Sequence, residues 1–63
     1  MRNEASRNER PMSVRELAEF LGVPVSTIYY WRHMGRGPRA LKAGRWLRFG
    51  LADVREWLER QAG

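Results

Sequence analysis

Six cationic side chains recur within one nineteen-residue stretch of this 63-residue chain, and no acidic residue interrupts them. They are Arg32, Arg36, Arg39, Lys42, Arg45 and Arg48. This stretch, residues 32–50, carries a charge of +6, whereas residues 1–31 sum to zero and residues 51–63 to −1, which leaves the net +5 of the chain. Arginine presents a planar fork of N–H donors that fits phosphates and guanine edges. Because solvated faces usually mix in acids, the stretch predicts a surface that binds a polyanion, although composition alone also allows an acidic protein or a membrane surface.

Residue sets suited to catalysis or metal binding are not apparent in the sequence. The chain has no Cys, and its single His, His33, has no second type of metal ligand at a suitable spacing. Glu16 stands at a helix-capping position rather than as a general base, and neither a Ser/His/Asp set nor a Gly-rich strand-to-helix loop is present. We therefore expect no enzymatic activity, no cofactor, no metal and no small-molecule substrate.

The length of the chain allows one domain at most, and a domain this small is only marginally stable. Without cysteines its stability must come from packing, to which three Trp, two Tyr and two Phe contribute. No apolar run reaches the roughly 18 residues of a membrane span, and the N-terminus lacks the apolar region of a signal peptide. We expect a cytoplasmic protein in which residues 1–11 form a flexible arm and residues 12–63 the domain.

Two short helices must position the first part of the basic stretch. Ser13-Val14-Arg15-Glu16 is a capping box, and Val14, Leu17, Ala18 and Leu21 form an apolar stripe that Phe20 extends up to Gly22. Pro24 suits the start of a second helix over residues 25–34, in which Ile28 and Trp31 point inward with Val25 nearby. The other faces carry Ser26, Thr27, Tyr29, Tyr30, Arg32 and His33. A tight turn between two such helices predicts a helix-turn-helix unit, whose second helix enters the major groove of DNA.

A hairpin must position the rest of the basic stretch. Residues 39–42 and 46–49 read as short strands around a turn at 43–45, with Leu41, Leu47 and Phe49 inward and Trp46 and Arg48 on the opposite face. A last helix begins near Leu51, with an apolar stripe of Leu51, Val54, Trp57 and Leu58. The order helix, turn, helix, basic hairpin, helix predicts a mainly α winged helix-turn-helix with a small β-hairpin as the wing.

The sequence also resembles the excisionase family, small helix-turn-helix proteins of phages, plasmids and actinobacteria that are related to the DNA-binding domain of MerR-like regulators. The resemblance spans residues 12–61 and rests on motifs such as Thr27-Ile28-Tyr29-x-Trp31-Arg32, Gly35-x-Gly37-Pro38, Lys42-x-Gly44 and Asp53-Val54-x-x-Trp57-Leu58. It implies that Ser26, Thr27, Tyr29, Tyr30 and Arg32 face DNA and that Lys42, Arg45 and Arg48 form a basic wing. The chain departs from the family at Pro24, where Ser or Thr is usual, and at Trp46, which is larger than the polar residue expected there.

These observations define a candidate DNA-binding site and a candidate function. The recognition-helix set is Val25, Ser26, Thr27, Tyr29, Tyr30, Arg32 and His33, and the wing set is Arg36, Arg39, Lys42, Arg45 and Arg48. As the resemblance implies, the protein would be an excisionase that binds repeated sites in double-stranded DNA cooperatively with further copies of itself, bends the DNA and directs an integrase towards excision. A small MerR-like transcriptional regulator remains an alternative, and so does an adaptor that holds an acidic protein on the basic hairpin.

Overall fold

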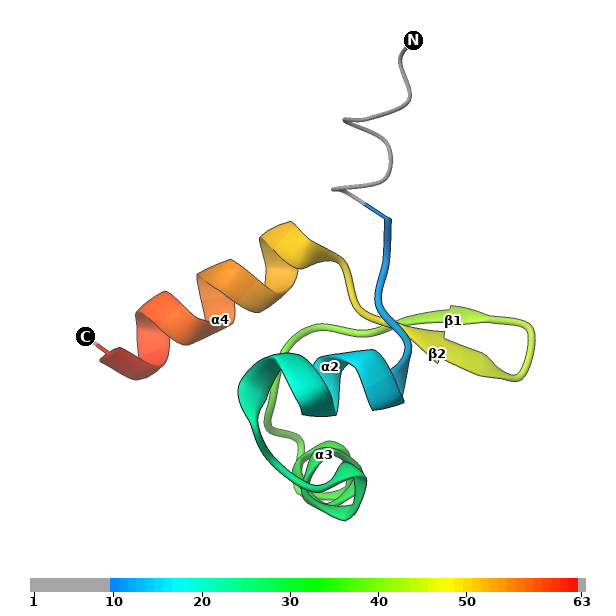
Figure 1. The fold of residues 1–63 in the computed structure, drawn as a ribbon, viewed down its shortest axis with the longest axis horizontal. Helices are drawn as coiled ribbons and strands as arrows, with labels where there is room; N and C mark the ends of the chain where they lie inside the picture. Colours follow the sequence, from blue (N-terminus) through cyan, green and yellow to red (C-terminus); the bar gives the residue numbers. More distant parts are fainter. Residues whose placement is uncertain (1–9, 63) are drawn as a thin grey trace, which may run out of the picture.

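A computed structural model describes residues 10–62, so residues 1–9, most of the predicted arm, lie outside the described residues. Helix α2 spans Val14–Leu21 and helix α3 spans Val25–His33. Strands β1 (Leu41–Ala43) and β2 (Trp46–Arg48) form an antiparallel hairpin, and helix α4 spans Leu51–Ala62. Within residues 10–62, three helices and one hairpin in this order form the predicted winged helix-turn-helix, and the hairpin projects away from the helices (Figure 1).

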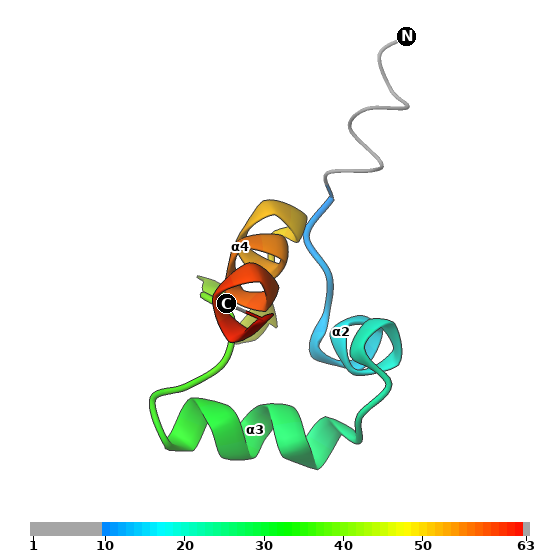
Figure 2. The same cartoon turned by 90° about the vertical axis from the view of Figure 1, so that its left-hand side faces the viewer.

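The boundaries of α2 follow from its capping residues. The Glu16 amide donates to Ser13 Oγ at 3.1 Å, and the Ser13 amide donates to Glu16 Oε1 at 2.8 Å, which confirms the capping box. Gly22 ends the helix at φ 73°, a left-handed conformation that a side chain disfavours. The residues from Gly22 to Pro24 then turn the chain into α3, which crosses beneath α2 (Figure 2).

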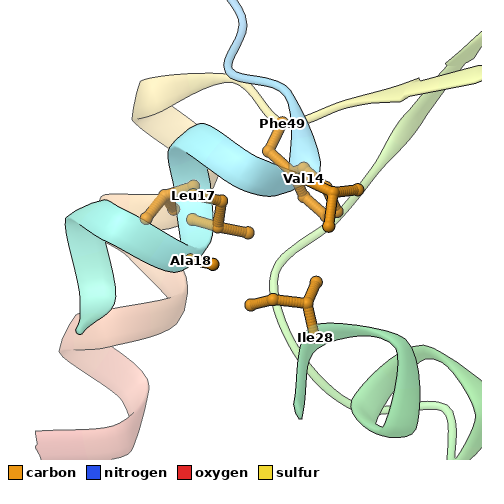
Figure 3. Packing of buried hydrophobic residues seen from close by; sticks show 6 residues of the cluster. Val14, Leu17, Ala18, Ile28 and Phe49 are labelled. Carbon is orange, nitrogen blue, oxygen red and sulfur yellow. The ribbon is translucent and has the colours of Figure 1, made fainter. Parts of the chain in front are cut away.

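The core contains side chains from α2, α3 and α4 and from the residue that follows β2. Leu17 of α2, Ile28 of α3, Val54 of α4 and Phe49 are fully buried. Val14 and Ala18 of α2 complete the buried cluster, and Figure 3 shows Phe49 and the α2 side chains above Ile28. The predicted stripe of α2 is confirmed except at Phe20, which is 53% exposed because it projects beside the stripe rather than along it.

The hairpin corrects one prediction about which side chains point inward. Leu41 lies opposite Arg48 and Lys42 lies opposite Leu47, so Leu41 and Leu47 are on different faces of the hairpin. Leu41 is therefore 50% exposed, whereas Leu47 is half-buried against the core and Phe49 is fully buried. The turn consists of two residues rather than three, because Ala43 belongs to β1.

A short bridge ties the base of the hairpin to the segment before α2. The Met12 amide donates to the Phe49 carbonyl at 2.8 Å, and the Phe49 amide donates to the Met12 carbonyl at 2.8 Å. A two-stranded hairpin is marginally stable by itself in water. The bridge and the burial of Phe49 anchor the hairpin to the helix-turn-helix unit.

A pair of tryptophans joins α3 to α4, and Trp31 of this pair also packs against the core. Trp31 and Trp57 are half-buried rather than fully buried, and their ring centroids lie 5.1 Å apart at an angle of 47°. Gly37 lies against Trp31 with φ 88°, and a Cβ at this position would be 3.2 Å from the Trp31 Cβ.

Leu58, predicted within the apolar stripe of α4, is exposed. None of the helices among residues 10–62 has the length and hydrophobicity needed to cross a membrane.

Candidate nucleic-acid interface

An open groove of about 680 Å³ runs between the start of α2, one face of α3 and the hairpin. It is lined by Ser13, Val14, Arg15, Val25, Tyr29, Arg32, Lys42, Arg45, Trp46, Leu47 and Arg48. Five of these residues are cationic, and among the described residues no acidic one contributes to the lining. We call this feature the basic groove. A concave surface with charges of one sign attracts a polyanion more strongly than the same charges dispersed over the molecule.

Helix α3 presents one stripe of side chains to the basic groove. Val25, Tyr29 and Arg32 recur at four- and three-residue spacing, which places them on a single helical face. Ile28 is buried on the adjacent face, three residues after Val25 and four before Arg32, and its burial fixes the direction in which this stripe points. Pro24 precedes α3 at the N-cap and makes no side-chain capping hydrogen bond, so the hydroxyl contact expected of a Ser or Thr at this position is absent.

The hairpin contributes three cations and one aromatic ring to the basic groove. The Arg48 guanidinium donates to the Leu47 carbonyl at 2.8 Å, which restricts the orientation of this side chain. The Arg45 guanidinium carbon lies 5.4 Å from the centre of the Trp46 ring, within the range of a cation–π interaction. Lys42 is exposed and extends from the strand face that also carries Leu47.

Arg15 is a cation of the basic groove that the sequence analysis did not identify. It is exposed in the first turn of α2. In the sequence it belongs to residues 1–31, in which the positive and negative charges sum to zero. The fold brings it to the same groove as Arg32 and Arg48. The available signal was its position two residues after the capping residue Ser13, because the start of this helix faces the wing.

A family model described as helix-turn-helix domain matches residues 11–62, which is most of the chain. The protein belongs to this helix-turn-helix family. No characterised protein and no solved structure matched the chain. Membership indicates DNA binding, and the family, which includes excisionase-like DNA-binding proteins, is typically non-enzymatic.

The predicted recognition helix of this helix-turn-helix domain divides into two exposed stripes. Ser26, Tyr30 and His33 are exposed on the face adjacent to the stripe that lines the basic groove. Thr27 is half-buried at the start of α3, where its amide donates to the Pro24 carbonyl at 3.0 Å. Of the seven predicted positions on this helix, the groove therefore collects Val25, Tyr29 and Arg32.

Two of the five predicted wing residues lie outside the basic groove. Arg36 follows α3 and lines a separate hollow beside Trp31 and Trp57. Arg39 is exposed in the segment that leads into β1. The lining includes only Lys42, Arg45 and Arg48 from the predicted wing set.

One carboxylate lies at the margin of the basic groove. The backbone hydrogen bond from Ser13 lowers the pKa of Glu16, with smaller contributions from the Ser13 hydroxyl and from the positive charges of Arg10 and Arg48. The Glu16 carboxylate therefore stays ionised, and its hydrogen bond directs it towards the helix cap. No cluster of three or more His, Cys, Asp or Glu side chains that could hold a metal ion occurs in the part of the chain that the structure describes.

Proposed function

We propose that this helix-turn-helix domain is a sequence-specific double-stranded DNA-binding protein of the excisionase class. The observation that carries the proposal is the basic groove, in which five cations from two helices and a hairpin line one concave surface without an acid among the described residues. Phosphate contacts supply most of the sequence-independent affinity of such proteins, and the cations of this groove are the side chains that can make such contacts. The groove opens beside α3, the helix that corresponds to the recognition helix of the fold.

In this proposal the two parts of the surface have different tasks. Tyr29 and Arg32 approach base edges in the major groove, together with the adjacent exposed stripe of Ser26, Tyr30 and His33 and the start of the helix at Thr27. Val25 provides an apolar contact of the kind that fits a thymine methyl group. Lys42, Arg45 and Arg48 hold the sugar–phosphate backbone, and Arg36 and Arg39 extend the positive field beyond the groove. Replacing Arg32 by Ala should change the preference among sites by about 1–3 kcal/mol if its guanidinium reads a base edge.

Several copies are needed for a stable complex in this proposal. A single small module buries only about 600–1,000 Å² on DNA, so one copy should bind weakly. Adjacent copies on repeated sites would bind cooperatively, bend the DNA together and present it to an integrase. The protein would determine the direction of recombination without breaking any bond itself.

The test has two steps. Selection from random duplexes, followed by sequencing, identifies the preferred site and its repeat spacing. A mobility-shift titration on duplexes with one and with several such sites then measures cooperativity, and we expect the multiple-site duplex to fill over a narrower concentration range. Independent filling of the sites would refute the excisionase proposal and favour a small MerR-like transcriptional regulator. Absence of any shift even at low salt, with a retained acidic protein partner, would refute DNA binding and favour the acidic-protein adaptor.

A further inference from the structure

The tip of the hairpin carries a large apolar side chain that is not part of the core. Trp46 is 59% exposed, the largest exposed fraction among the large apolar side chains of the described residues. It is the first residue of β2 and follows the two-residue turn directly. It neither belongs to the buried cluster nor packs against it, and its cross-strand partner is the small Ala43. Its contribution to the stability of the fold is therefore small, and the exposed ring is available for contact with a ligand.

The surroundings of Trp46 indicate the chemistry of that ligand. Single exposed apolar residues are ordinary on protein surfaces, but this indole lines the basic groove together with Lys42, Arg45 and Arg48. A planar apolar ring on the same strand face as Arg48 and in contact with Arg45 matches a partner that carries anionic groups beside stacked planar groups. Duplex DNA has this arrangement, because two phosphate backbones flank the base stack. An acidic peptide would satisfy the cations but offers no regular stack for the ring.

We propose that Trp46 is a wedge that enters the minor groove and stacks on a partly opened base step, kinking the duplex. The proposal rests on the DNA binding proposed above. Apolar side chains inserted in this way unstack a step and bend DNA towards the major groove. In the free protein the Arg45 guanidinium covers one face of the indole, and on DNA it would exchange this face for a phosphate. Pyrimidine–purine steps, which unstack most readily, should be preferred under the wing.

The experiment compares Trp46→Ala and Trp46→Phe with a matched control, Phe20→Ala. Phe20 is exposed to a similar degree on α2 and does not line the basic groove. Affinity, its salt dependence and the end-to-end distance of a doubly labelled duplex are measured for each variant. We expect Trp46→Ala to lower the affinity roughly tenfold and to abolish the bend, because base–aromatic stacking is lost. The salt slope of Trp46→Ala should be unchanged, since no charge is removed. Trp46→Phe should retain most of the native affinity and most of the bend.

Intrinsic fluorescence tests the same contact without a destabilising change. Binding should quench part of the tryptophan emission of the native protein. Trp46→Phe should lose this response, because the remaining Trp31 and Trp57 contact each other away from the groove. If native protein binds and bends DNA but Trp46→Ala does so equally well, or if saturating DNA leaves the fluorescence unchanged, the wedge is refuted and DNA binding stands. If the native protein binds no duplex at low salt, the proposed function itself fails and the wedge fails with it.

Discussion

Replacing Arg15 by Ala tests whether the basic groove acts as one DNA-binding surface. Arg15 is exposed at the start of α2, so its removal should leave the core intact. It is the one cation of the groove that neither the wing nor the recognition helix supplies. An effect of this substitution on DNA binding would therefore report on the assembled groove rather than on either element alone.

The size of the effect follows from the number of cations in the groove. If all five neutralise phosphates, at a slope of −0.9 each, the logarithm of the affinity falls with the logarithm of salt at a slope of about −4.5. Raising salt from 50 to 200 mM should then weaken native binding about 500-fold. Without Arg15 the slope should be about −3.6 and the loss about 150-fold.

Fluorescence anisotropy with a short labelled duplex of mixed sequence measures both slopes, because phosphate contacts do not depend on sequence. Arg55→Ala is the matched control, since Arg55 is exposed on α4 and does not line the groove. It removes the same net charge and should leave the slope near the native value. Equal slopes for the two variants would mean that only total charge matters, and the groove would then not be the binding surface.

The remaining predictions concern stability and can be measured by thermal unfolding. Gly37→Ala should destabilise the domain more than Gly35→Ala. Both substitutions place a side chain in a left-handed conformation, which costs about 1–2 kcal/mol, but only Gly37→Ala adds a close contact, with Trp31. Equal losses of stability would contradict this prediction. Phe49→Ala should cost about 3–5 kcal/mol and leave the chain largely unfolded by circular dichroism, since a domain of this size has little more to lose. Ser13→Ala should cost about 1 kcal/mol through loss of the cap. Because folding lowers the pKa of Glu16, its carboxylate contributes to the free energy of unfolding fully above the ordinary glutamate pKa, and this contribution is lost as the pH falls through the pKa of the folded state. Glu16→Gln should remove this part of the pH dependence of stability.

The helical part of the fold could be predicted because its signals are local. The capping box at Ser13, the stripe through Leu17 and the breaker at Gly22 each act within a few residues, so they set the helix whatever surrounds it. The hairpin register is different, because one residue more or less in the turn exchanges the two faces of a strand. The placement of Ala43 in β1 moved Leu41 to the exposed face.

The charge-rich stretch from the end of the recognition helix through the wing was predicted, but the extent of the groove was not. Summing charge along the chain hides Arg15, because Glu16 and Glu19 cancel its charge in the sum although neither of them lines the basic groove. The same sum includes Arg36, which the fold places beside the tryptophan pair instead. Which cations share a surface depends on the crossing of α2 by α3 and on the anchoring of the hairpin, and both are products of tertiary packing.

The bridge between Met12 and Phe49 has a consequence for the order of events in folding. Helices α2 and α3 and the hairpin all lie between these two residues, so the bridge closes a loop that contains the whole basic groove. Closing such a loop is the slow, non-local step, whereas each helix and the hairpin turn can form locally. During synthesis Phe49 emerges long after Met12. The groove should thus be acquired in one late event, and a nascent chain with two complete helices would still lack its wing.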